Sequence, residues 1–97
     1  MPGAARVGDP GVPHCSAYVI ATGSTDVSIN GRPAARVGDL STPHLRPAGI
    51  FCVPHVAPIM TGSTSVFING RPAAVQGSYL GGCTIVALGS TDVNIGF

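Results

Sequence analysis

Apolar residues along this chain recur in short alternating runs. In the run 26–29, Val27 and Ile29 lie on one face of an extended segment and Ser28 lies on the other. No segment keeps the 3.6-residue apolar period of a helix for two turns without a Gly or a Pro, and the chain holds 14 Gly and 9 Pro. The pattern therefore predicts an all-β fold built from short hairpins.

An Asn-Gly pair ends this run. Asn30-Gly31 supplies the left-handed dihedral angles that a tight hairpin turn requires. We expect the segment 32–37 to return as the second strand, with Pro33 near its start at an edge or entry position.

The outgoing strand occurs three times, at 23–29, 62–68 and 89–95. The positions expected to point inward hold Val27, Val66 and Val93, with Ile29, Ile68 and Ile95 beneath them. The positions expected to point outward hold Ser28, Phe67 and Asn94. Further upstream, Ile20, Ile59 and Val86 occupy equivalent positions in the three copies. Similar side chains in threes predict a small, cone-like, pseudo-threefold body in which each repeat contributes one side.

The third copy lacks a return strand at the C-terminus. The segment 3–9, GAARVGD, has the sequence of a return strand and lies at the N-terminus. We expect the two ends of the chain to pair and close the third hairpin, which leaves no free sheet edge there. Met1 and Phe97 should then be adjacent in space.

The charge content is low, at 9% of residues, and comprises five Arg and four Asp. A chain without a concentrated basic face is not typical of nucleic-acid-binding proteins or of polybasic membrane anchors. Its apolar runs are far shorter than the ~20 residues of a spanning helix, and no signal peptide is evident. A mean hydropathy of +0.40 with so few charges indicates that a partner covers part of the surface.

A constant spacing connects each return strand to a candidate metal ligand. His14 lies five positions after Asp9, His44 five positions after Asp39, and Cys83 five positions after Ser78. In a pseudo-threefold body these three equivalent side chains converge near the axis. The middle repeat is longer and adds His55, which follows a Pro as the other two His do.

Three imidazoles and one thiolate make a closed tetrahedral site of the kind that zinc prefers. We therefore expect one structural Zn²⁺, with ligands His14, His44, His55 and Cys83. Cys52, three residues from His55, is the alternative to His55 as a ligand. Cys15 is adjacent to His14, so on a strand it would face the other way. The odd number of Cys and the missing signal peptide favour metal ligation or free thiols over a disulfide framework.

Enzyme motifs are missing from the sequence. It contains no G-x-S-x-G, no H-E-x-x-H, no phosphate-binding loop and no G-x-G-x-x-G. Ser24, Ser63 and Ser90 recur in threes, which fits strand entries better than a unique nucleophile. Four protein ligands leave zinc no open position, so we expect no catalysis. Without His55 the site opens, and the alternative is a small zinc-dependent hydrolase. A metal buffer or sensor is a third hypothesis, in which the repeat has no purpose.

The segment Pro33-Ala34-Ala35-Arg36, followed by Val37-Gly38-Asp39, resembles the proline-alanine-alanine-arginine (PAAR) repeat family. The copy at 72–75 departs from this motif at Val75, which replaces Arg, and the copy at 3–6 departs at Gly3, which replaces Pro. Repeats and ligand spacing together extend the resemblance over essentially the whole chain.

The resemblance implies a cone-like β-structure that caps the trimeric VgrG spike of bacterial type VI secretion, or the related spike of a contractile phage tail. In that family three His and one Cys hold a zinc at the point of the cone, and the matching positions here are His14, His44, His55 and Cys83. The role is mechanical, because a contracting sheath drives the tip from the bacterial cytoplasm through a target membrane and delivers effectors.

Some members of the family carry toxin or transthyretin-like extensions. We expect residues 1–97 to form a single PAAR-like domain without one, a monomer on a trimeric partner. Any effector would be a separate chain. We expect no nucleic-acid partner and no stable membrane insertion.

Overall fold

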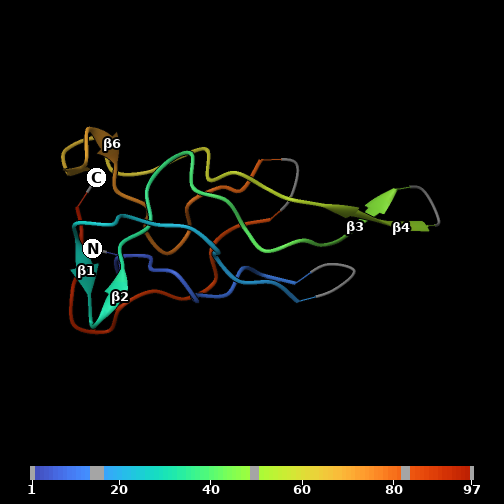
Figure 1. The fold of residues 1–97 in the computed structure, drawn as a ribbon, viewed down its shortest axis with the longest axis horizontal. Coiled ribbons are helices and arrows are strands. Elements are labelled where there is room, and N and C mark those ends of the chain that lie inside the picture. The colour runs from blue at the N-terminus through green and yellow to red at the C-terminus, as the bar shows by residue number, and fades with distance from the viewer. Residues whose placement is uncertain (1, 14–16, 49–50, 82–83, 97) are drawn as a thin grey trace.

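The computed structural model describes residues 2–13, 17–48, 51–81 and 84–96 (Figure 1). The strands are β1 (Ser28–Ile29), β2 (Arg32–Pro33), β3 (His44–Ala48), β4 (Phe51–His55), β5 (Phe67–Ile68) and β6 (Arg71–Pro72). They form three separate antiparallel pairs, β1-β2, β3-β4 and β5-β6. No helix occurs among the described residues, so the predicted all-β class with short hairpins agrees with the structure.

The Asn-Gly turns form as predicted. Asn30 has φ 53° and Gly31 has φ 77°, and Asn69 and Gly70 repeat these values at 54° and 77°. Positive φ at both central residues defines a turn whose twist matches that of the two flanking strands. Ile29 consequently pairs with Arg32 across the first hairpin.

The return strand was predicted to continue to residue 37, and this prediction was wrong in its extent. β2 ends at Pro33. Ala34 still donates to Val27 of its own hairpin, and from there on the backbone pairs mainly with other repeats. The pairs between repeats are Arg6 with Ala34, Arg36 with Ala73, and Ala4 with Val75. The return segments of the three repeats therefore hold one another.

A closed ring of three backbone hydrogen bonds lies at the centre of this arrangement. Ala35 donates to the carbonyl of Ala5 at 3.0 Å, Ala5 donates to Ala74 at 2.9 Å, and Ala74 donates to Ala35 at 3.0 Å. All three alanines are buried. Three backbones converge here, so a side chain larger than a methyl group would have to displace one of them. The repeated Ala-Ala is therefore required by packing.

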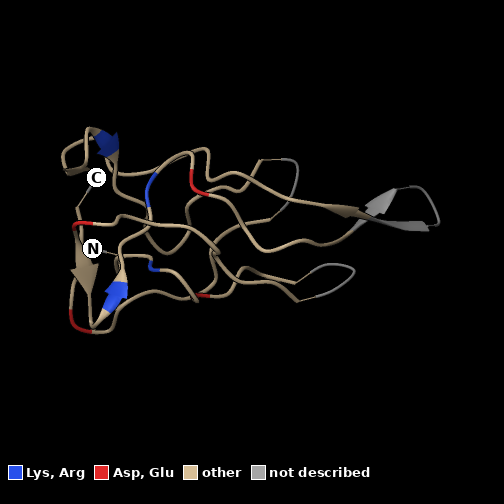
Figure 2. Cartoon of the chain, in the orientation of Figure 1, with Lys and Arg blue, Asp and Glu red and all other residues tan. Residues whose placement is uncertain are grey.

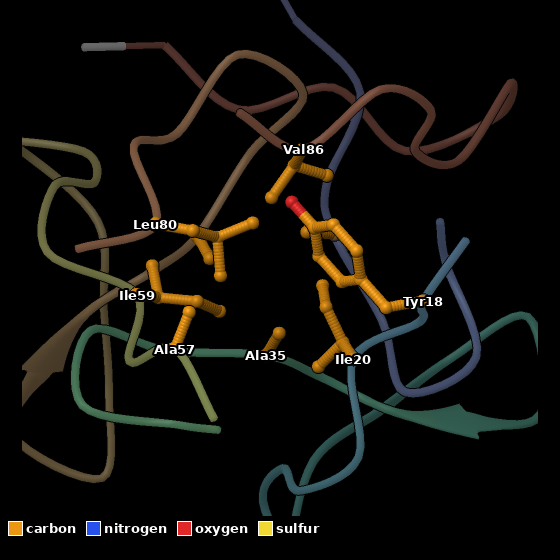
Figure 3. Close-up of a cluster of buried hydrophobic side chains, with 9 residues drawn as sticks. Tyr18, Ile20, Ala35, Ala57, Ile59, Leu80 and Val86 are labelled. Carbon is orange, nitrogen blue, oxygen red and sulfur yellow. The ribbon is translucent and has the colours of Figure 1, made fainter. Parts of the chain in front are cut away.

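Two apolar clusters flank this ring. The first contains Tyr18, Ile20, Ile59, Leu80 and Val86 and is drawn in Figure 3. The second contains the other alanine of each repeat together with Val75, Ile29, Ile68 and Ile95. The isoleucines at 29, 68 and 95 are thus inward-facing, as predicted, and the corresponding residues at 20, 59 and 86 are buried in the first cluster.

The valines of the outgoing strands were predicted to lie in the core, and this was wrong. Val27, Val66 and Val93 are 37%, 37% and 38% exposed. The carbonyl of Val27 accepts a hydrogen bond from Ala34, and Val66 and Val93 accept equivalent bonds from Ala73 and Ala4. The backbone is thus tied to the body, while the side chains are only partly covered. Ser28, Phe67 and Asn94 are exposed, as predicted.

The ends of the described chain pair with each other. Ile95 donates a hydrogen bond to the carbonyl of Pro2 at 2.9 Å, and Gly3 bridges Asn94. The N-terminal segment therefore supplies the return strand of the third repeat, as predicted. Met1 and Phe97 themselves lie outside the described residues.

The long hairpin β3-β4 extends away from the body, at the opposite end from β1, β2 and β6 (Figure 1). Its register runs from His44 opposite His55 to Ala48 opposite Phe51. The molecule is elongated along this direction, with extents of 39 × 24 × 22 Å. Within the described ranges, no helix is long and apolar enough to cross a membrane.

Candidate metal centre

Two of the four predicted ligands face each other where the long hairpin leaves the body. His44 begins β3 and His55 ends β4, and the two residues pair directly across the hairpin. Directly opposite residues of an antiparallel pair project to the same face. Nε2 of His44 lies 2.7 Å from Nε2 of His55, with the ring centroids 4.3 Å apart and the planes at 68°.

The other ring nitrogen of His44 is held by the backbone. Nδ1 of His44 lies 2.9 Å from the carbonyl oxygen of Thr42, which can only accept, so Nδ1 carries the hydrogen. In the neutral ring Nε2 then presents its lone pair toward His55. Metal-binding His typically have this arrangement, in which a carbonyl fixes the tautomer and the ring orientation. His44 is buried, at 5% exposure.

This donor set fits a zinc ion on chemical grounds, because neutral imidazole nitrogens are ordinary zinc ligands. His14 and Cys83, the remaining predicted ligands, lie outside the described residues. Among the residues that the structure describes, no third His, Cys or carboxylate joins a metal-binding group. The structure thus brings His44 and His55 together, and the full ligand set stays a prediction.

The alternative cysteine ligands are placed differently. Cys52 pairs with Pro47, three residues farther along the hairpin than the His44–His55 pair. Three residues of strand correspond to about 10 Å. Cys15 lies outside the described residues.

Tyr18 contacts this site and was not predicted from the sequence. Its ring stacks on the imidazole of His44, with centroids 3.9 Å apart and an interplanar angle of 14°. Figure 3 shows the ring reaching across the apolar cluster between Ile20 and Val86. The repeat alignment contains a signal for it, because Tyr18 corresponds to Ala57 and Thr84, and only one repeat has a large ring there.

A buried ion pair holds Asp39, where the segment that leads to His44 begins. Arg36 donates to Asp39 from Nε at 3.0 Å and from Nη2 at 3.1 Å, while its backbone N–H donates to the same carboxylate at 2.8 Å. The side-chain hydrogen bond to Asp39 raises the pKa of the Arg36 guanidinium, against a lowering by desolvation. Since the raised pKa lies above the already high ordinary value, Arg36 is charged at every working pH.

Arg6 and Asp9 form the equivalent pair in the return segment 3–9, and there Arg32 adds a second guanidinium at 3.0 Å. The return segment 71–78 has Val75 and Ser78 in place of Arg and Asp, and Val75 N–H donates to the Ser78 hydroxyl at 2.9 Å. Both charges are replaced together, so no unpaired charge is buried. Figure 2 shows charged positions, in blue and red, in the body of the molecule, and β3 itself includes Arg46.

The repeated serines are structural, as predicted. The hydroxyl of Ser24 accepts the N–H groups of the residues two and three positions later, and Ser63 and Ser90 do the same. Each hydroxyl also donates at 2.6 Å to a neighbouring repeat, with the acceptors Asn69, Gly96 and Asn30 respectively. Each serine therefore ties a turn to the next repeat.

Comparison with known protein families matches residues 2–42 to the model described as the PAAR motif. This stretch includes two return segments, the Arg6–Asp9 and Arg36–Asp39 pairs, and most of the segment between Asp39 and His44. Comparison with curated proteins gives no match. The chain therefore carries the PAAR motif over residues 2–42, and this match supports its assignment to the PAAR-repeat family.

Proposed function

We propose that this protein is the spike tip of a bacterial type VI secretion machine and caps a trimeric VgrG-like spike. The PAAR motif at residues 2–42 carries this proposal. The closed ring formed by Ala5, Ala35 and Ala74 supports it, because each repeat makes the same contact with the next. A single chain can match a trimer only by presenting three equivalent sides. The proposed shape is a pseudo-threefold cone.

The proposed docking surface is the base formed by Val27, Val66 and Val93. These valines occupy equivalent positions and are equally exposed, at 37–38%, so the base offers the same apolar contact three times. Phe67 adds a further exposed apolar side chain, at 57%. A polar rim surrounds an apolar centre in many protein interfaces. Here Asn69 donates to Asp26 at 3.1 Å beside the valines.

At the opposite end, the proposal places one structural zinc, with His14, His44, His55 and Cys83 as ligands. The facing Nε2 atoms of His44 and His55 and the carbonyl of Thr42 on Nδ1 support it. When bound, the ion would supply a cross-link between loops of all three repeats, which stabilises a small core. His55 opposite His44 favours a closed site over the open position that a zinc hydrolase needs.

The proposed action is mechanical. The protein would wait in the bacterial cytoplasm on the end of the spike, and sheath contraction would carry it through the target membrane.

The test is sedimentation of this protein with the trimeric VgrG-like protein of the same genome, with an expected stoichiometry of one chain per trimer. The variant Val66→Asp should weaken the complex by at least about tenfold, because it desolvates a charge in the interface. Met60→Asp, at a position 55% exposed on the flank, is the matched control and should bind normally. Absence of a complex with the unmodified protein, or turnover of a hydrolase substrate by the zinc-loaded protein, would contradict the proposal.

A further inference from the structure

Tyr18 is a single large ring at the junction between the core and the His44–His55 pair. We propose that Tyr18 is a positioning residue, which aligns the metal-binding segments of the three repeats before an ion enters. This inference rests on the proposed zinc site. It concerns a residue that is not itself a ligand.

The first contact is with His44. The Tyr18 ring lies nearly parallel to the imidazole, at 3.9 Å and 14°, and is buried at 4% exposure. A ring in this position limits rotation of the imidazole about its side-chain bonds. The hydrogen bond from Nδ1 to the Thr42 carbonyl removes the remaining freedom. Nε2 of His44 is therefore aimed at His55 by two restraints.

The second contact is made by the hydroxyl group. Tyr18 Oη lies 2.7 Å from Oγ1 of Thr84, and Oγ1 of Thr84 donates to the carbonyl of Val12. A threonine hydroxyl has one hydrogen, so Tyr18 must be the donor in its bond with Thr84. The order of donation is thus Tyr18 to Thr84 to Val12.

This chain of hydrogen bonds reaches the two segments that carry the other predicted ligands. Thr84 directly follows Cys83 in the sequence, and Val12 is two residues before His14. The Tyr18 ring therefore contacts His44 directly, and its hydroxyl contacts Thr84, next to Cys83 in the sequence. Through Thr84 the hydroxyl is also linked to Val12, in the segment that leads to His14. The ion would be expected to bind to segments that are already held in place.

Small residues leave room for this ring. A Cβ atom on Gly11, in the same loop as Tyr18, would lie 2.1–2.3 Å from the Tyr18 ring and hydroxyl, which is too close for non-bonded heavy atoms. At the positions corresponding to Tyr18, the other repeats have the small residues Ala57 and Thr84. One repeat therefore supplies a large ring at this position, and the other two supply small side chains.

Three variants test this role. Tyr18→Phe keeps the stack and loses the donor to Thr84, Tyr18→Leu loses both, and Tyr79→Phe changes the other tyrosine, which is 44% exposed. Zinc affinity is measured by competition with a chromophoric chelator, and unfolding by denaturant with and without zinc. We expect affinity to fall about tenfold in Tyr18→Phe and about 100-fold in Tyr18→Leu, the range for residues that orient metal ligands. Tyr79→Phe should bind as the unmodified protein does.

A residue with only a structural role would behave differently. It would lower the unfolding midpoint equally with and without zinc and leave the affinity unchanged, whereas a positioning role reduces the stabilisation that zinc provides. The chain has two Tyr and no Trp, so in Tyr79→Phe the tyrosine band of the near-ultraviolet circular dichroism reports on Tyr18 alone, and we expect this band to change on zinc titration.

The results distinguish a failure of the Tyr18 role from a failure of the zinc site. If the unmodified protein binds no zinc, the metal site itself is wrong and the role of Tyr18 falls with it. If it binds one zinc per chain and Tyr18→Phe binds equally tightly, only the positioning role is overturned. Tyr18→Phe preserves the ring volume, so a failure of Tyr18→Leu to fold would leave the decisive comparison intact.

Discussion

Nε2 of His55 lies 2.7 Å from Nε2 of His44, across the first residue pair of the long hairpin. No repeat equivalent of His55 exists, because it belongs to the segment that makes the middle repeat longer. The register of β3-β4 nevertheless places it opposite a residue that the repeat does predict. Because His44 and His55 face each other directly, each predicted ligand can be tested by a single substitution.

The first prediction concerns zinc content. His44→Ala and Cys83→Ser should each lower bound zinc and melting temperature together, because removal of the ion removes a cross-link from a small core. Metal analysis and thermal unfolding measure the two effects, and a chelator should lower the melting temperature of the unmodified protein. Cys52→Ser is the matched control and should keep its zinc. Unchanged metal content in both ligand variants would refute the assignment.

The second prediction concerns the alanine ring. Ala35→Val adds two methyl groups where three backbones meet, and overpacking of this kind costs about 1–3 kcal/mol of unfolding free energy. Ala21→Val, at an exposed position, is the control and should change stability by no more than about 0.5 kcal/mol. Denaturant titration measures both. Equal stability of the two variants would mean that the ring tolerates larger side chains.

The third prediction concerns the buried pair of Arg36 and Asp39. Arg36→Val leaves the carboxylate of Asp39, whose side chain is 4% exposed, without its main partner, and should cost about 3–5 kcal/mol. Adding Asp39→Ser reproduces the Val75 and Ser78 of the return segment 71–78, so the double variant should be more stable than Arg36→Val alone. A double-mutant cycle in denaturant measures the coupling. Additive losses would show that the segment 71–78 is not a valid model for the segment 32–39.

The fourth prediction concerns the space around Tyr18. Gly11→Ala should cost about 1–3 kcal/mol, because its Cβ would overlap the Tyr18 ring. In a Tyr18→Ala background the same substitution should cost much less, since the ring is gone. Denaturant unfolding of the four proteins measures this difference. A cost that is the same in both backgrounds would place the strain elsewhere.

In one repeat, a hydrogen-bond acceptor and the N–H that it would bind are both replaced. Thr22 accepts the N–H of Leu40 at 3.0 Å, and Thr61 accepts the N–H of Tyr79 at 2.9 Å. The corresponding pair in the remaining repeat is Leu88 and Pro10. Proline has no N–H, so no acceptor is needed opposite it. These residues are far apart in the sequence, and the alignment alone did not connect them.

The sequence by itself determined the features that depend on neighbouring residues. The all-β class, the Asn30-Gly31 and Asn69-Gly70 turns, the three repeats and the pairing of the two chain ends were all predictable. Each follows from local backbone preferences or from a pattern that recurs along the chain. The same reasoning proposed His14, His44, His55 and Cys83 as ligands, of which the described residues include two.

Only the tertiary structure decided where the hydrogen bonds of the return segments go. A strand that leaves its hairpin after two residues can pair with any edge in reach, and here Arg36 pairs with Ala73 of the next repeat. The exposure of Val27 and the stacking of Tyr18 on His44 are likewise set by which segments from distant parts of the chain meet. Side-chain alternation shows which residues share a face of a strand. What covers that face depends on contacts between repeats, which no local pattern encodes.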